Sequence, residues 1–283
     1  MSKKVLRTTK IGQVTQKGGN GKTTITLNLG YELSLLNKKV LMLDVDPQAS
    51  LSKNLVGEEK LPAVKGIEEL YLNPALDPAE FIRESGMKNV FIIPSHSTLS
   101  GIPATLLYEG DGFFTLRKII ENMEKDFDFD YILIDTPGNL EFLTLSAILA
   151  SDHLIIPVYP ALYSLLAIND LINTIEKMKR NYGSEVEILG VLLTMMDRRA
   201  NLYKEFEEEV REYFGKRAFK TSTSRTVKSE EATLKGTGVS ELFPDCLLSS
   251  EYKNLIGEII SRMNTDEEQS STDLKNGAEL NGG

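Results

Sequence analysis

Short apolar runs alternate with amphipathic stretches along most of this chain. Runs rich in Val, Ile, Leu and Met predict strands at residues 10–15, 39–44, 90–93, 131–135, 153–157 and 188–195. Runs such as VLML and YILI are apolar at successive positions, which is typical of strands buried on both faces of a parallel sheet. Apolar residues at helical spacing predict helices at 23–36, 114–124, 162–180, 202–214 and 249–263. This alternation predicts an α/β fold with a single doubly wound, mostly parallel sheet flanked by helices.

The pattern also divides the chain into a body and a tail. We expect one domain over residues 1–263, because no strong linker and no internal repeat interrupt the alternation. Residues 264–283 are rich in Ser, Asn, Gly and Glu and poor in large apolar residues, which predicts an acidic, disordered tail. Five acidic residues and one lysine in this tail account for four of the nine net negative charges of the chain.

Composition excludes several classes of site and location. The chain has 283 residues and a single cysteine, so it has no partner for an internal disulfide and too few thiols for an iron–sulfur cluster. Its first residues, MSKKVLRTTK, lack the apolar stretch of a signal peptide. No run of about 20 apolar residues could span a bilayer. These features predict a cytoplasmic protein, and the charge of −9 disfavours constitutive coating of nucleic acid or anionic lipid.

A glycine-rich loop between the first strand and the first helix is the sharpest chemical feature. It reads KGGNGKTT and is a variant of the phosphate-binding loop GxxxxGK[ST] that lacks the usual first glycine. Glycines let the backbone approach phosphates closely, and the following helix N-terminus adds free N–H groups to an anion site. In such a loop the lysine reaches the β- and γ-phosphates and the next hydroxyl ligates Mg²⁺. The predicted ligands of ATP and Mg²⁺ in this loop are Lys17, Gly18, Gly19, Asn20, Gly21, Lys22, Thr23 and Thr24.

Carboxylates end two of the predicted strands. Asp44 ends the strand at 39–44 and Asp46 lies two residues further on, and Asp135 ends the strand YILID. Ligands of open α/β sheets bind at the carboxyl ends of the strands, and residues i and i+2 of a strand share a face. We therefore expect these three carboxylates near Mg²⁺ and water, with Asp44 and Asp135 as metal ligands.

Taken together, the segments KGGNGKTT, DVDPQAS and IDTPG resemble the ParA/MinD family of deviant Walker ATPases, in particular its ParA (Soj-like) branch. The similarity extends from about residue 9 to about residue 260 and includes the segment GVLLTMMDRRANL. The resemblance implies an ATPase that binds ATP and Mg²⁺ and forms a nucleotide-sandwich homodimer when ATP is bound.

By motif, the resemblance assigns roles to single residues. Lys17 matches the signature lysine that reaches the partner subunit's phosphates, and Gly18 matches the glycine at which bulk would block dimer closure. Asp46 matches the carboxylate that orients water, so the implied catalytic residues are Lys17, Lys22, Asp46 and Asp135. Met196 and Arg225 fall where the family packs against adenine. The chain departs from the family pattern at Asn20, Ser224 and Lys228, where Val, Pro and Arg are usual.

The resemblance further implies partners. ParA-like ATPases bind DNA non-specifically as ATP dimers, and a ParB-like centromere-binding protein stimulates their slow hydrolysis. The candidate DNA contacts here are Arg198, Arg199, Arg225 and Lys228. We therefore expect a cytoplasmic protein that partitions plasmid or chromosomal DNA, associates with the nucleoid when ATP is bound and has no membrane partner.

Three alternatives remain open from the sequence. The chain could position a protein cargo instead of DNA, or act as a MinD-like membrane-linked regulator. The acidic C-terminus disfavours the latter, because a MinD-like anchor is a basic amphipathic helix. A metabolic Walker-fold ligase is the third alternative, and Lys17 argues against it because such enzymes do not need the signature lysine.

Overall fold

The computed structural model describes residues 8–108, 110–160 and 165–280, with side chains described up to Asn264. Its centre is a seven-stranded sheet in the order β3-β4-β2-β5-β1-β6-β7. All neighbouring strands are parallel except β3, which pairs antiparallel with β4 at the edge. The strands are β1 (Thr9–Gln13), β2 (Val40–Asp44), β3 (Arg83–Glu84), β4 (Val90–Ile93), β5 (Tyr131–Asp135), β6 (His153–Val158) and β7 (Glu187–Leu193).

Side chains of the central strands alternate between two buried faces. In β2, Val40 and Met42 join the apolar cluster on one face, whereas Leu41 and Leu43 join the cluster on the other. A strand in the middle of a parallel sheet is covered on both sides, so successive apolar residues are all buried. This explains why the strands read as continuous apolar runs.

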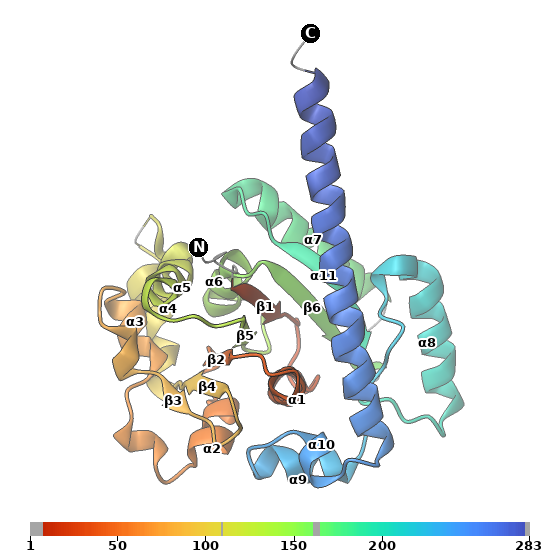
Figure 1. Cartoon of the computed structure of the whole chain (residues 1–283), viewed down its shortest axis with the longest axis horizontal. Helices are drawn as coiled ribbons and strands as arrows, with labels where there is room; N and C mark the ends of the chain where they lie inside the picture. The colour runs from red at the N-terminus through yellow and green to blue at the C-terminus, as the bar shows by residue number, and fades with distance from the viewer. Residues whose placement is uncertain (1–7, 109, 161–164, 281–283) are drawn as a thin grey trace.

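The first face of the sheet is covered by the helix that follows the glycine-rich loop and by the C-terminal helices. Ile25, Leu29 and Leu33 of the first helix pack with Leu255 and Ile259 of the last one. Figure 1 shows the last helix crossing the sheet beside the first. The helices of this face are α1 (Lys22–Leu35), α2 (Ser50–Val56), α9 (Val227–Leu234), α10 (Val239–Leu242) and α11 (Leu247–Leu280).

The opposite face carries two adjoining apolar clusters. One lies under the β4-β2-β5 half of the sheet and the other under the β1-β6-β7 half. The helices of this face are α3 (Ile67–Leu72), α4 (Ile102–Leu106), α5 (Thr115–Asp126), α6 (Phe142–Ala150), α7 (Leu165–Tyr182) and α8 (Asn201–Phe214). Short 3₁₀ turns are η1 (Leu61–Ala63), η2 (Pro78–Glu80), η3 (Ser97–Gly101), η4 (Gly112–Phe114) and η6 (Gly215–Arg217).

The doubly wound α/β prediction is confirmed, and each of the six predicted strands overlaps an observed one. The strand predicted at 188–195 ends at Leu193, because the backbone turns left-handed at Met195, whose φ is 51°. The first three residues of the helix predicted at 162–180 lie outside the described residues, and α7 is described from Leu165.

The division into a body and a disordered tail stays a prediction. The structure continues α11 to Leu280, with no proline to interrupt it, whereas the sequence predicted disorder from residue 264. Side chains after Asn264 lie outside the described residues, as do residues 281–283 altogether. Within the described part of the chain, every helix is too short or too polar to serve as a membrane span.

Candidate nucleotide-binding site

The glycine-rich loop joins β1 to α1 at the carboxyl end of the sheet. Gly19 and Gly21 have φ values of +82° and +74°, a backbone region that residues with a side chain rarely adopt. Gly21 caps α1, and Lys22 is its first residue, so the helix N-terminus opens onto the loop. A loop of this shape presents N–H groups and the positive end of the helix dipole to an anion.

Lys22 lies beneath the loop with 7% of its surface exposed. Its Nζ donates a hydrogen bond to Thr15 Oγ1 over 3.0 Å, and that hydroxyl donates to the carbonyl of Lys17 over 2.9 Å. Burial lowers the pKa of Lys22, while the negative charges of Asp135 and Asp46 act in the opposite direction. The ammonium group therefore has little contact with water and lies within the electrostatic influence of two carboxylates.

Asp135 and Thr23 meet at the end of β5. Thr23 Oγ1 donates to Asp135 Oδ2 over 2.7 Å, whereas the buried Oδ1 has no hydrogen-bond partner among the described residues. Burial, with the neighbouring Asp44 carboxylate as the next cause, raises the pKa of Asp135 to about 8. A carboxylate oxygen left without a donor beside a hydroxyl is a suitable donor set for Mg²⁺ or a water bound to it. The residues present therefore fit a magnesium ion at this position.

Asp44 has a different environment from the one that the sequence predicted. It lies beside Asp135 in the register of β2 and β5, but it is fully buried. Its Oδ2 accepts from the backbone N–H and the hydroxyl of Ser52, and its Oδ1 accepts from the N–H of Asp46 over 3.0 Å. These donors occupy both oxygens, so the geometry favours Asp44 as a support for the Asp46 turn over the predicted direct metal ligand.

A cavity of about 680 Å³ opens over the loop, a size ordinary for small-molecule sites. It is lined by Gly18–Thr23 of the loop, by Asp46–Gln48 after β2 and by Pro137–Asn139 after β5. Gly138 permits the close approach of the last segment, because a Cβ there would lie 2.6 Å from the Cα of Gly18. The cavity thus brings the predicted loop and Asp46 together. Lys17 is exposed on the loop and is not among the described residues that line this cavity.

A second cavity, of about 230 Å³, lies on the other side of Gly19 and Gly21. Of the two residues predicted to pack against the base, Arg225 lines this cavity and Met196 does not. Met196 is 2% exposed in the apolar core, and Met195, turned by its positive φ, faces the cavity instead. The one-residue difference arises because strand alternation stops at Met195.

The cavity also contains residues that sequence reasoning missed. Tyr159 and Thr194 directly follow β6 and β7, so the rule that ligands bind at the carboxyl ends of strands could have found them. Tyr252 comes from α11, and no local sequence signal connects it with the loop.

The departure at Asn20 is accommodated within the loop. Asn20 is 1% exposed, and its Nδ2 donates to the carbonyl of Lys17 over 3.0 Å. Its own carbonyl accepts from Thr194 Oγ1 over 3.2 Å, which connects the loop to the residue after β7. The side-chain amide therefore acts on the shape of the loop.

The predicted DNA contacts have unequal surroundings. Arg198 donates a hydrogen bond of 2.7 Å to Glu251, although its side chain is 45% exposed. Arg199 pairs only with its neighbour Asp197 among the described residues, and its side chain is 91% exposed. Arg225 and Lys228 are exposed, and the Lys228 ammonium lies 5.2 Å from the ring centre of Phe243.

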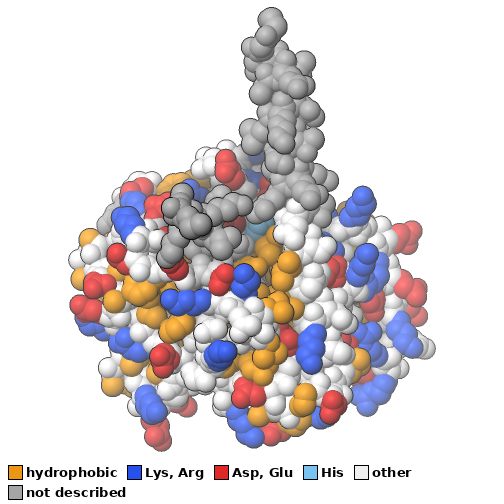
Figure 2. All heavy atoms as spheres, viewed as in Figure 1, with side chains coloured by type: hydrophobic (Ala, Val, Ile, Leu, Met, Phe, Trp, Pro, Cys, Tyr) orange, Lys and Arg blue, Asp and Glu red, His pale blue; other side chains and the backbone are white. Residues whose placement is uncertain are grey.

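On the face of the molecule shown in Figure 2, Lys and Arg are mixed with Asp and Glu across the described residues. This face therefore presents no broad positive surface. Arg198 and Arg199 lie in the loop after β7, and the bridge between Met196 and Ser224 brings Arg225 beside that loop.

The family comparison matches most of the body of the chain. The model of an AAA domain family, AAA_31, matches residues 8–188. The sporulation initiation inhibitor protein Soj of Bacillus subtilis is 34% identical over 244 residues, which cover 86% of this chain and 95% of Soj. The chromosome partitioning protein ParA of Caulobacter vibrioides is 32% identical over 248 residues, which cover 87% of this chain and 92% of that protein.

Solved structures show the same fold. A Cyanothece McdA variant in complex with ATP has a TM-score of 0.76 and 27% identity, with 90% of this chain and 96% of that chain covered. The septum site-determining protein MinD of Pyrococcus horikoshii, complexed with Mg-ADP, has a TM-score of 0.72 and 21% identity, with 89% and 96% covered.

Proposed function

Because this chain belongs to the ParA/MinD family of ATPases, and is an ATPase that uses ATP and Mg²⁺, we propose that it partitions plasmid or chromosomal DNA. It does so as an ATP-dependent homodimer that binds DNA non-specifically. The observation that carries the proposal is the pair of lysines on one loop. Lys22 lies buried beneath the loop, whereas Lys17 is exposed on it outside the lining of its own cavity.

The residues of the first cavity have separate roles in phosphoryl transfer to water. Lys22 neutralises charge on the β- and γ-phosphates, and Asp46 orients the attacking water from the opposite loop. Thr23 and the Asp135 oxygen that has no hydrogen-bond partner among the described residues would hold Mg²⁺, which would supply further positive charge against the triphosphate. Because such catalysis depends on positioning and charge stabilisation, an incomplete set of cations gives slow hydrolysis.

The second subunit completes this set. Lys17 reaches the phosphates bound by the partner subunit, so full charge stabilisation exists only in the closed dimer. A Cβ added at Gly18 would meet no described atom within 4 Å, so nothing described within one subunit requires glycine there. The requirement that the resemblance implies therefore arises from the close approach of the second subunit.

DNA binding by the closed dimer depends on the exposed group Arg199, Arg225 and Lys228. We expect retention on DNA at low salt with ATP and not with ADP. Arg199→Ala should weaken retention about tenfold and make the salt dependence shallower, because each phosphate contact contributes roughly 0.9 to the slope of log K against log salt. DNA retention across a salt series measures both effects.

Two matched variants make this test specific. Arg180→Ala removes an exposed arginine from the last turn of α7, outside the group, and should leave retention unchanged. Gly18→Val should abolish retention while all three cations remain, because the dimer does not close. Equal retention with ATP and ADP, or none at low salt, would contradict DNA binding switched by nucleotide.

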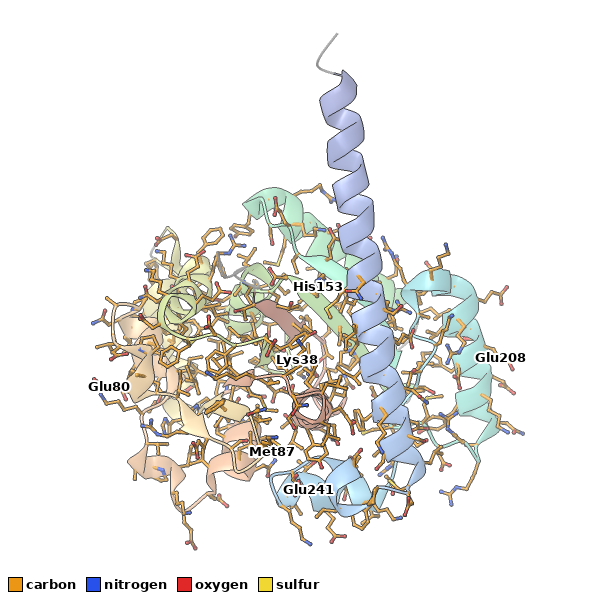
Figure 3. The ribbon with its side chains drawn as sticks, in the orientation of Figure 1. Lys38, Glu80, Met87, His153, Glu208 and Glu241 are labelled. Carbon is orange, nitrogen blue, oxygen red and sulfur yellow. The ribbon has the colours of Figure 1, made fainter. Side chains whose placement is uncertain are left out.

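We propose that a ParB-like partner docks its basic segment on the outer side of α8. Glu205, Glu208 and Glu209 are exposed there, and Figure 3 shows Glu208 pointing away from the body. Opposite charges attract such a segment at low ionic strength. Reversing all three charges should reduce partner-stimulated hydrolysis about tenfold or more and leave basal hydrolysis unchanged. Stimulation that survives the reversal would place the docking site elsewhere.

A further inference from the structure

Glu251 of α11 joins two loops beside the second cavity, the loop after β7 that carries Arg198 and the loop after η6 that carries Ser224. It is 5% exposed, and its carboxylate accepts hydrogen bonds from two different loops. The backbone N–H of Ser224 donates to Oε2 and the Ser224 hydroxyl to Oε1, each over 2.7 Å. Arg198 donates to Oε1 through Nη2 over 2.7 Å and through Nε over 3.3 Å.

The backbone around Ser224 explains why this carboxylate is needed. Thr223 and Arg225 pair with Met196 through backbone hydrogen bonds of 2.9 and 3.1 Å, as in a short parallel bridge. In a strand, alternate N–H groups point to opposite sides, so the N–H of Ser224 faces away from Met196. On that side no neighbouring strand among the described residues accepts the N–H, and the Glu251 carboxylate accepts it instead. A proline, the residue usual at this position in the resembling family, has no N–H to donate.

The same glutamate lies directly against the cavity wall. Its neighbours on α11, Leu248 and Tyr252, line the second cavity together with Ser224 and Arg225. Glu251 thus binds the residue next to Arg225, which is the only arginine among the described lining residues of this cavity. Because Arg225 N–H is one end of the bridge to Met196, a shift of Ser224 would move Arg225 relative to the cavity.

We propose that Glu251 is a positioning residue that holds Ser224 and Arg225 against the nucleobase and so determines how much the base adds to ATP affinity. This inference rests on the proposed function, in which the second cavity takes the base of ATP. The phosphates are bound by Lys22 and Thr23 on the other side of the glycine loop, which Glu251 does not touch. Loss of Glu251 therefore affects binding of the base and leaves binding of the phosphates intact.

α11 also provides a matched control. Glu258, seven residues along the same helix, accepts the N–H groups of Lys220 and Thr221 over 2.8 and 2.9 Å. Like Glu251, Glu258 accepts backbone N–H groups of the loop that contains Ser224. Lys220 and Thr221, however, do not line either described cavity. A purely structural role would make the two glutamates equivalent, whereas a positioning role for the base distinguishes them.

The test compares Glu251→Gln with Glu258→Gln in the full chain, using steady-state hydrolysis and binding of Mg-ATP and of Mg-tripolyphosphate, which has no base. Glu251→Gln should raise KM for ATP about tenfold with kcat within about twofold, because it weakens charge-assisted hydrogen bonds behind the base cavity. Affinity for tripolyphosphate should not change, and Glu258→Gln should leave both ligands unaffected.

Ser224→Ala keeps the test valid if Glu251→Gln does not fold. It removes one hydroxyl from a half-buried side chain and should raise KM for ATP by a smaller factor with the same selectivity. An unchanged KM in both variants, or an equal loss of tripolyphosphate affinity, would overturn the role of Glu251. Wild-type protein that neither hydrolyses ATP nor binds DNA would instead overturn the proposed function.

Discussion

Lys22→Gln is expected to reduce ATP hydrolysis about 100-fold or more and to weaken Mg-ATP binding strongly. The Lys22 ammonium is 7% exposed and lies beneath the glycine loop, held by Thr15 Oγ1. Removing a single preorganised charge from a site that stabilises developing negative charge costs about 100- to 1,000-fold in rate. Glutamine removes the charge while it preserves most of the side-chain volume. Phosphate release and calorimetric binding measure the two effects.

The burial of Lys22 gives this substitution a second measurable effect, on thermal unfolding. Burial lowers the pKa of Lys22 by more than Asp135 and Asp46 raise it, so the Lys22 charge costs folding free energy. The variant should therefore unfold at the same or a higher temperature without nucleotide. Lys53→Gln, at an exposed lysine of α2, should change neither hydrolysis nor unfolding. Hydrolysis by Lys22→Gln within about tenfold of wild type would show that the charge of Lys22 is not the main phosphate anchor.

Asp46→Asn is expected to separate ATP binding from hydrolysis. Asp46 lines the first cavity, and its turn is fixed by the N–H bond to Asp44 and by Gln48 N–H, which donates to Asp46 Oδ1 over 2.9 Å. Asparagine keeps this oxygen but loses the charge that orients water. Hydrolysis should fall about 100-fold or more, whereas ATP affinity should change less than about threefold. ATP-dependent DNA retention should then last longer, which dissociation after dilution measures.

A second Asp-Pro turn in the chain serves as the control. Asp77 Oδ1 accepts from Ala79 N–H over 2.9 Å, as Asp46 Oδ1 accepts from Gln48. Asp77 is an exposed residue at the start of η2 and is not among the described residues that line either cavity. Asp77→Asn should leave hydrolysis and retention unchanged. If Asp46→Asn lost ATP affinity in proportion to its activity, Asp46 would support the shape of the site and would not orient water.

Elements with a distinctive apolar pattern could be predicted from the sequence. Elements that lack such a pattern, or that form only by pairing with a distant part of the chain, could not. The central strands stood out because burial on both faces makes them continuously apolar. α6 was missed because its sequence, FLTLSAILA, is buried nearly all round and has no polar face to reveal a helical period. β3 has two residues and exists only through its pairing with β4, so no local pattern could indicate it.

The site was predictable where chemistry depends on spacing along the chain. The glycine loop and the acids at the carboxyl ends of β2 and β5 lie together as strand order and register require. The environment of Asp44 was not predictable, because it depends on Ser52 of α2. The hydrogen bonds from Arg198 to Glu251 could not be predicted either, because the two residues are 53 positions apart in the sequence. Contacts made by side chains between distant elements need the folded chain.

The glycines that separate the two cavities give the protein a chemical handle. Gly19 and Gly21 belong to the lining of both, so in the proposed function the reacting phosphates and the base occupy opposite sides of one thin backbone wall. Substituents could be added to the base, and matching space created at Ser224 or Met195, without disturbing the residues that act on the phosphates. An engineered pair of nucleotide and variant would allow this ATPase alone to be switched inside a living cell that contains many others.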